Sequence, residues 1–177
     1  RPRTEPRFYG GPYPFVQTGD VVASNGRIRS YIQTLNDVGL SISRLFPKGT
    51  ILITIAANIG ETALAEFDVA FPDSLVGIIP RGKVGARYLE YFLRTQKEAL
   101  IKVATESAQK NINLQILRPW PVALPPMDEQ VVIADMLDSI GALETTEAER
   151  LESQRQTKSS LMQALLTGEI RVKVAEE

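Results

Sequence analysis

One uninterrupted helical pattern near the C-terminal end constrains the fold of this chain more than any other feature. Between Met127 and Thr167 the sequence contains no proline and a single glycine, Gly141. Two prolines and two acidic residues mark its start, and Gly168 follows its end, as is typical of helix termini. About 40 residues rising ~1.5 Å each form a rod of roughly 60 Å. Because this rod is longer than the width of the domain that precedes it, it must extend beyond that domain and pack against another structural element.

An apolar stripe along this predicted helix indicates that the other element is a second helix. Positions taken at a 3–4 spacing are apolar near both ends of the helix and polar in its middle. A helix with such a stripe buries little surface by itself, so a facing helix is needed. The residues that we expect to pair are Ile133, Leu137, Ile140, Leu151, Leu161 and Leu165.

The charge distribution favours an antiparallel partner. Residues 128–149 hold seven acidic residues and no basic one, whereas residues 150–168 hold three basic residues and one acidic residue. A parallel copy would set acid against acid, and an antiparallel copy sets acid against base. Each exposed pair contributes only a few tenths of a kcal/mol, but several pairs together choose between similar packings. The apolar residues at the two ends fit both directions.

The residues before the rod predict a mixed α/β (α+β) globular domain. Proline and glycine in residues 9–14 indicate a turn-rich loop. Apolar pairs on either side of Thr18-Gly19-Asp20 indicate a strand, a turn and a second strand over residues 15–22. The β-branched run at residues 50–56 predicts a strand buried on both faces, because it is short and almost continuously apolar.

The second half of this domain predicts further short strands and then a helix. The strands are expected at 62–65, 69–71 and 75–79. Apolar spacing of three and four residues from about Ala86 to Ala104 predicts one amphipathic helix packed on the sheet. Trp120 stands between prolines, and we expect it in the core or against the rod rather than on a surface that stacks bases.

Composition excludes several kinds of chemistry. The chain has no cysteine and no histidine, which removes disulfides, thiolate ligands, and the commonest general base and zinc ligand. No phosphate-binding loop, dinucleotide-binding glycine motif or nucleophile elbow is present. Pro72-Asp73 could begin a nuclease-like carboxylate motif, but Arg81 stands where a second carboxylate would be required. We therefore expect no catalytic residue, no metal site and no cofactor in this chain.

The net charge of −1 conceals an asymmetry between the two parts of the chain. Residues 1–127 carry 15 Lys and Arg against 10 Asp and Glu, a net charge of +5, and residues 128–177 carry a net charge of −6. A basic domain can attract a polyanion, although this excess is also ordinary for a domain of its size. No apolar run approaches the ~18 residues of a membrane span, so we expect a cytoplasmic protein without a membrane partner.

Several short motifs, taken in order, resemble a known family. The segment Phe8–Val21 resembles the opening of a target recognition domain in the specificity subunits of type I restriction–modification enzymes. Further matches follow in the expected order and cover nearly the whole chain. They are Pro47–Leu52, Ile59–Glu61, Gln109–Asn113, Pro125–Gln130 and Leu165–Ile170.

The resemblance implies a non-catalytic, DNA-reading chain of a bacterial or archaeal cytoplasm. Such subunits carry two target recognition domains, each of which reads one half of a split double-stranded DNA site. Two long helices pair antiparallel as a spacer between the half-sites. The subunit docks methyltransferase (modification) subunits that use S-adenosylmethionine, and restriction (motor–nuclease) subunits that use ATP and Mg.

On this resemblance, residues 1–126 form a target recognition domain, residues 127–167 a spacer helix and residues 168–177 a tail. One domain and one helix correspond to half of the family arrangement. The second helix would come from a homodimer or from a longer chain, and the absence of an initial methionine favours a piece of a longer chain. The alternative is a protein–protein interaction or oligomerisation module without DNA readout.

Donors on loops, with cations for phosphate, are what DNA readout requires. The loop Ser24–Arg29 is the first candidate, because Asn and Arg side chains make bidentate base contacts; the alternative is a surface hairpin with solvated arginines. Lys110 and Asn111 are the second, unless Asn111 caps local backbone. Four further basic residues, Arg44, Lys48, Arg81 and Lys83, are candidate phosphate contacts. The full set is Ser24, Asn25, Arg27, Arg29, Arg44, Lys48, Arg81, Lys83, Lys110 and Asn111.

Overall fold

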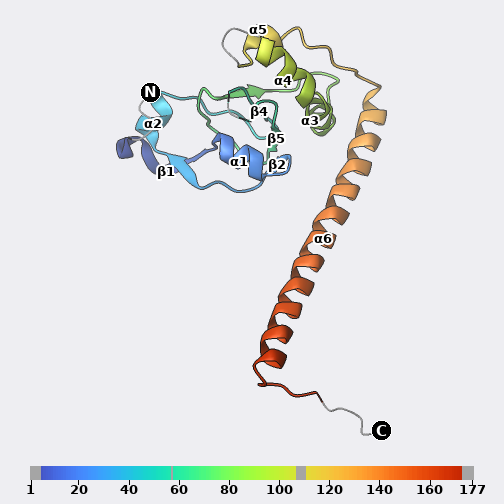
Figure 1. Cartoon of the computed structure of the whole chain (residues 1–177). Helices are drawn as coiled ribbons and strands as arrows, with labels where there is room; N and C mark the ends of the chain where they lie inside the picture. The colour runs from blue at the N-terminus through green and yellow to red at the C-terminus, as the bar shows by residue number, and fades with distance from the viewer. Residues whose placement is uncertain (1–4, 57, 107–110, 173–177) are drawn as a thin grey trace. The chain divides into compact units, whose positions relative to one another are not determined.

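The computed structural model describes residues 5–56, 58–106 and 111–172 (Figure 1). The chain divides into two compact units, Arg1–Ala134 and Asp135–Glu177. The first unit combines helices with two β-sheets. The second unit contains most of one long helix, α6 (Met127–Leu166), whose first two turns belong to the first unit. The mixed α/β domain with a long C-terminal helix that the sequence predicts is confirmed.

The first unit opens with a single 3-10 turn, η1 (Pro6–Phe8). Its strands and helices follow in chain order. They are β1 (Tyr9–Phe15), α1 (Thr18–Ala23), β2 (Arg27–Ile28), β3 (Gln33–Leu35), α2 (Asp37–Ser41), β4 (Ile51–Thr54), β5 (Thr62–Ala65), β6 (Leu75–Ile78), α3 (Ala86–Thr95), α4 (Lys97–Glu106) and α5 (Leu114–Leu117).

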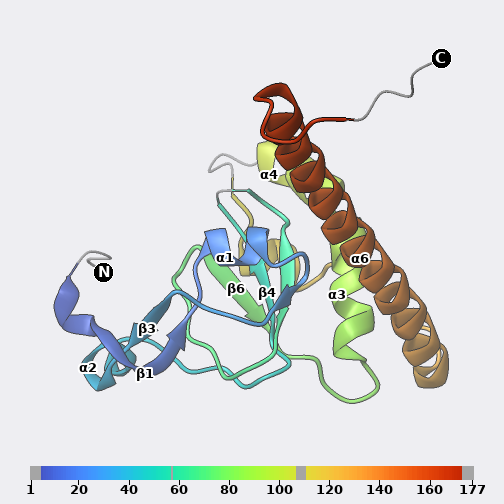
Figure 2. The same ribbon diagram turned by 90° about the horizontal axis from the view of Figure 1, so that it is seen from below.

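The main sheet has four strands in the order β2-β5-β4-β6. Strand β2 runs parallel to β5, and β4 runs antiparallel to both β5 and β6. A separate two-stranded sheet pairs β1 with β3 and lies beside the main sheet (Figure 2). The loop between β2 and β3 therefore connects the two sheets.

Alternating side chains on the central strands explain why the main sheet is covered on both faces. Leu52 and Ala63 pack with Val21 of α1 on one face. Ile51 packs with Leu89 and other side chains of α3 on the other face. Because successive strand residues point to opposite faces, only a continuous apolar run can serve both layers. All residues of β4 and β5 are buried.

The structure confirms the predicted strands at β4, β5 and β6 but corrects the region around Thr18. The predicted strand–turn–strand at residues 15–22 is wrong, because β1 ends at Phe15 and helix α1 begins at Thr18. The Gln17 side chain accepts from the backbone N–H of Asp20, and the Asp20 carboxylate accepts from the N–H of Gln17 at 2.8 Å. This capping box satisfies first-turn donors and stabilises a short helix. The predicted loop at residues 9–14 is strand β1.

The predicted single helix from Ala86 to Ala104 is two helices, α3 and α4. Gln96 ends α3 and has backbone angles φ −85° and ψ 0°, which depart from the helix. Both helices still pack on the sheet, since Leu93 and Leu100 are buried in neighbouring clusters. Trp120 packs against the cluster that contains Leu100, which confirms its predicted place in the core.

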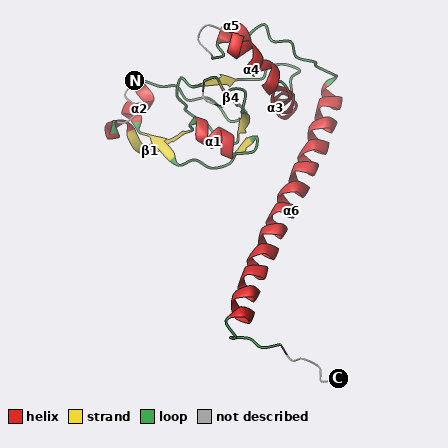
Figure 3. Cartoon of the chain, in the orientation of Figure 1, coloured by secondary structure: helices red, strands yellow, loops and turns green. Residues whose placement is uncertain are grey.

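The predicted rod is confirmed as α6, drawn as one unbroken helix in Figure 3. It ends where expected, with Gly168 at φ +76° and the backbone N–H of Ile170 donating to the Ala164 carbonyl at 2.9 Å. This left-handed residue is the usual C-terminal cap. Gln130 and Ala134 are the buried residues of α6, and both belong to the first unit. None of the described helices is long and apolar enough to cross a membrane.

Candidate nucleic-acid interface

The strand order gathers basic residues along one edge of the main sheet. Because β2 and β5 are parallel and β4 is antiparallel to β5 and β6, the ends of β2, β5 and β6 lie at the same edge as the start of β4. Arg29 follows β2, Lys48 precedes β4, and Arg81 and Lys83 follow β6. These four residues and Arg27 form what we term the basic edge. The four are exposed.

Two carboxylates organise part of the basic edge. Glu66, which follows β5, lies 3.5 Å from a guanidinium nitrogen of Arg27 and 3.6 Å from one of Arg29. Asp68 accepts a hydrogen bond from the backbone N–H of Lys48 at 2.8 Å. Arg27 is half-buried, whereas the Arg29 side chain is 72% exposed. The Arg29 guanidinium is paired with Glu66 but remains largely exposed, so its other nitrogens can bind a phosphate or a base edge.

A groove of about 320 Å³ runs beside the two arginines. Ser24, Arg27 and Arg29 line it, together with the loop that joins β2 to β3. The ring of Tyr31, in that loop, packs edge-on against Phe67 with centroids 5.1 Å apart. The structure thus brings three of the predicted DNA-binding residues to one groove.

Arg44 lies beside the basic edge through its neighbour Phe46. The guanidinium carbon of Arg44 lies 5.0 Å from the centre of the Phe46 ring. Phe46 forms an isolated β-bridge with Val69, directly after Asp68. The cation–π contact holds the exposed Arg44 side chain against Phe46, two residues before Lys48 in the chain.

The Asn25-Gly26 turn contacts an ion pair between the half-exposed Arg94 and the buried Glu90, which the sequence did not predict. Asn25 has φ 46° and Gly26 has φ 87°, so both occupy the left-handed region. Arg94 of α3 donates to the Asn25 carbonyl at 3.3 Å and to Glu90 at 2.9 Å. Thr62 of β5 donates to the same Glu90 oxygen at 3.0 Å. A side chain at Gly26 would collide with the Arg94 guanidinium.

Burial raises the pKa of Glu90 above its ordinary value of 4.5, although Arg94 partly opposes the effect. The folded state then binds the Glu90 proton more tightly than the unfolded state does. The stabilisation that protonated Glu90 contributes is fully present below the pKa that Glu90 has in the unfolded chain. It is lost as pH rises through the higher pKa that Glu90 has in the folded chain.

We expect Glu90→Gln to remove this pH dependence. Between about pH 4 and pH 8, the unfolding free energy of the original chain should fall relative to that of the variant, measured by urea unfolding. Glu98→Gln, at an exposed position of α4, is the matched control. A constant difference between the Glu90→Gln variant and the original chain across this range would contradict the buried role of Glu90.

Of the second predicted pair, the structure describes only Asn111, which lies away from the basic edge. Lys110 lies outside the described residues. The neighbour of Asn111, Ile112, donates its backbone N–H to the carbonyl of Ile55 at 2.9 Å, and Ile55 follows β4 at the opposite edge. Asn113 instead caps α5 by accepting from two backbone N–H groups.

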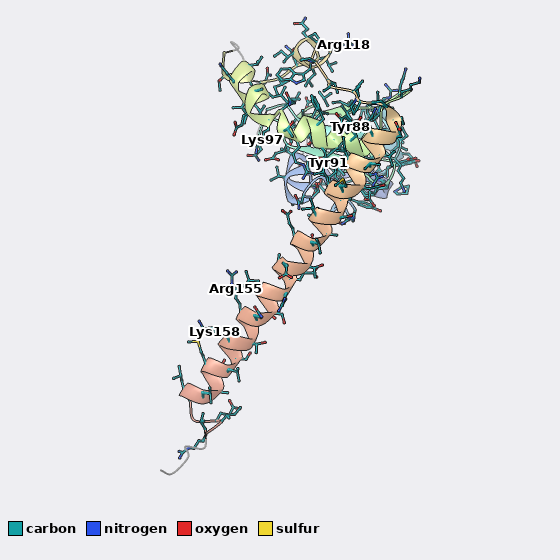
Figure 4. The ribbon with its side chains drawn as sticks, turned by 90° about the vertical axis from the view of Figure 1, so that its right-hand side faces the viewer. Tyr88, Tyr91, Lys97, Arg118, Arg155 and Lys158 are labelled. Atoms are coloured by element: carbon teal, nitrogen blue, oxygen red, sulfur yellow. The ribbon has the colours of Figure 1, made fainter. Side chains whose placement is uncertain are left out.

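The six predicted pairing residues lie along α6, and the five from Leu137 onward belong to the second unit. Leu137, Ile140, Leu151, Leu161 and Leu165 are between 36% and 53% exposed, and Ile133 is half-buried. Arg155 and Lys158 project from the same side of α6 (Figure 4). The helix therefore presents apolar and basic side chains together, as a helix that pairs with another helix does. Among the described residues no cluster of three or more acidic, histidine or cysteine side chains could hold a metal ion.

Comparison with known proteins identifies the family. Residues 2–153 match the family model described as the type I restriction modification DNA specificity domain. The specificity subunit of type I restriction enzyme MjaVIII from Methanocaldococcus jannaschii is 30% identical over 141 residues, which is 77% of this chain and 32% of the relative. The chain therefore belongs to the type I restriction–modification DNA specificity family. It spans about a third of the length of the curated relatives it matches.

Solved structures show that the fold is shared. A chain from a type I restriction–modification system superposes with a TM-score of 0.68 at 21% identity, covering 90% of this chain and 40% of that chain. The HsdS subunit from Thermoanaerobacter tengcongensis gives a TM-score of 0.63 at 22% identity, with coverage of 93% and 40%. These similarities include the long helix as well as the α/β domain, because they extend over most of this chain.

Proposed function

We propose that this chain reads one half of a split double-stranded DNA site as part of a non-catalytic specificity subunit. The observation that carries the proposal is the basic edge. Sheet topology brings basic residues from three separate segments to one edge of the main sheet, in a domain whose family model is named for DNA specificity. Cations gathered at one edge of a sheet can contact neighbouring backbone phosphates together, which cations scattered over a surface cannot do.

The candidate residues divide between phosphate and base contacts. Lys48, Arg81 and Lys83 are exposed on loops and suit phosphate oxygens, which position a protein on DNA without reading sequence. Arg29 and Asn25 carry planar groups that can form bidentate contacts with guanine and adenine, respectively. The ion pair of Glu90 and Arg94 orders the Asn25 turn before DNA binds, which reduces the entropy lost on binding.

The long helix supplies the second part of the proposal. Its exposed apolar stripe pairs antiparallel with a second helix, from another copy of this chain or from the rest of a longer chain. The pair acts as a spacer between two recognition domains in the cytoplasm of a bacterium or archaeon. Methyltransferase subunits with S-adenosylmethionine, and restriction subunits with ATP and Mg, dock on the assembled subunit and carry out the chemistry.

A salt titration tests DNA binding directly. With a pool of random duplexes and the cognate methyltransferase subunit added, we expect log K to fall against log salt with a slope of about −3 to −5, the release expected for roughly four to five phosphate contacts. Lys48→Ala with Arg81→Ala, which removes two of the proposed phosphate contacts, should lower the steepness by about 2. The control variant, Lys102→Ala with Arg118→Ala, removes two exposed basic residues outside the basic edge and should leave the slope nearly unchanged. A flat slope for the unmodified chain would exclude the proposal.

A second candidate function is a protein-interaction module without DNA readout. The observation that favours it is the exposed apolar stripe of α6, which suits a protein partner and needs no nucleic acid. Capture of a methyltransferase subunit distinguishes the two functions. Capture that strengthens with one particular DNA sequence supports half-site reading, whereas capture independent of DNA sequence supports the interaction module.

A further inference from the structure

The loop that joins β2 to β3 projects one apolar side chain beside the arginines of the basic edge. Ile32 is 90% exposed, the highest value among the large apolar residues of the domain. Exposing an aliphatic side chain of this size forgoes the stabilisation that its burial would give. Single exposed apolar residues are common on protein surfaces, so the surroundings of Ile32 decide its meaning.

Those surroundings hold the loop in a fixed conformation. At its start, the backbone N–H of Glu66 donates to the Ile28 carbonyl at 3.1 Å, which ties the loop to β5. At its end, Gln33 pairs with Phe15 in the small sheet. Between these anchors the Tyr31 ring packs on Phe67. A loop fixed at both ends and in its middle presents Ile32 without paying the full entropy of ordering a mobile tip.

The chemistry beside Ile32 selects the partner. The residue lines the same groove as Ser24, Arg27 and Arg29. Arg27 and Arg29 share the Glu66 carboxylate and Asp20 also lines the groove, so the largely exposed Arg29 is the cation that contacts a polyanion here. The aliphatic side chain of Ile32 needs an apolar group within that polyanion. In the major groove of DNA the thymine 5-methyl group is the apolar feature that side chains contact. Arginine and isoleucine together therefore match a guanine or phosphate next to a thymine.

We propose that Ile32 is a specificity-determining residue that contacts a thymine methyl group in the DNA half-site. This inference rests on the proposed function and adds to it a base type and the side chain that reads it. Neighbouring Tyr31 is a positioning residue, because its ring fixes the loop on Phe67.

Replacement of thymine by uracil tests the contact, since the exchange removes only the methyl group. A duplex is first selected from a random library by the full chain with the cognate methyltransferase subunit. Each thymine in the selected site is then replaced singly by 2′-deoxyuridine. At one position, uracil should weaken binding by the original chain about four-fold, which corresponds to ~0.8 kcal/mol for one buried methyl group.

Ile32→Ala should weaken binding to the thymine duplex by about the same factor and abolish the uracil effect. Ile32→Val keeps a methyl branch and should retain most of the effect. Val38→Ala, an exposed β-branched residue of α2, is the matched control and should leave the uracil effect intact. This cycle has a readout that a merely structural role of Ile32 would not change.

The outcomes separate the inference from the proposed function. If no sequence is enriched from the library, both fail. If a site is enriched but uracil has no effect on the original chain, or has the same effect on Ile32→Ala, the Ile32 contact alone is excluded. The latter results would also be expected if Ile32 were a minor-groove wedge, because the thymine methyl group lies in the major groove.

Discussion

Gln130→Ala should lower the free energy of unfolding of the first unit, Arg1–Ala134, by about 2–4 kcal/mol, because it leaves buried polar groups without partners. Gln130 is 1% exposed in the first turn of α6. Its side-chain oxygen accepts from the N–H of Gly85 at 2.8 Å, and its amide donates to the carbonyls of Lys83 and Pro125 at 3.0 and 2.8 Å. One side chain thereby connects α6 to the loop that carries part of the basic edge.

Urea unfolding of purified variants measures this effect. Gln163→Ala, an exposed glutamine of the same helix, controls for the change in side chain and helix propensity and should alter stability by less than about 0.5 kcal/mol. Gln130→Glu keeps the acceptor for Gly85 but loses both donors and buries a charge, so it should be at least as destabilising as alanine. Equal stability of Gln130→Ala and Gln163→Ala would show that the three hydrogen bonds contribute nothing net.

Gln130 also shows what sequence reasoning can and cannot supply. The segment Pro125–Gln130 stands out as a helix start, and the absence of helix breakers predicts α6 correctly. Nothing in the sequence indicates that this glutamine is buried, since its partners Lys83 and Gly85 lie more than forty residues away in the chain. Helix signals are local and can be predicted, whereas long-range polar contacts depend on how the elements pack.

The same distinction applies to the candidate interface. The sequence identifies Arg29, Lys48 and Arg81 as basic residues on separate loops, but only the strand order β2-β5-β4-β6 places them at one edge of the sheet. Glu90 has the pattern of an ordinary helix carboxylate, and its burial follows from contacts with Thr62 and Arg94. The sequence does not indicate helix α1, because the helix has only 6 residues and its Gly19 suggests a turn.

The other large effect concerns self-association through α6. We expect the chain to form an antiparallel dimer and Leu137→Asp with Leu161→Asp to abolish it, because each copy would place two charges in an apolar seam. Sedimentation should show the mass falling from dimer to monomer. Ala142→Asp with Gln163→Asp adds the same charges at exposed positions away from the stripe and should leave the dimer intact. An unchanged mass in the stripe variant would exclude this interface.

The charge pattern further specifies the register of that dimer. Centring two antiparallel helices on Leu151 sets acids opposite bases and large side chains opposite small or apolar ones. In this register the facing pairs are Leu137 with Leu165, Ile140 with Met162, Gly141 with Leu161, Glu144 with Lys158 and Glu147 with Arg155.

Because the chain contains no cysteine, engineered disulfides report this register without interference. An oxidised mixture of Leu137→Cys and Leu165→Cys chains should yield a crosslinked heterodimer, whereas Leu137→Cys alone should stay uncrosslinked. Crosslinking of Leu137→Cys with itself would indicate a parallel pair and contradict the charge argument. A wild-type chain that sediments as a monomer would instead place the second helix in a separate segment, and the same seam would then be tested against that segment.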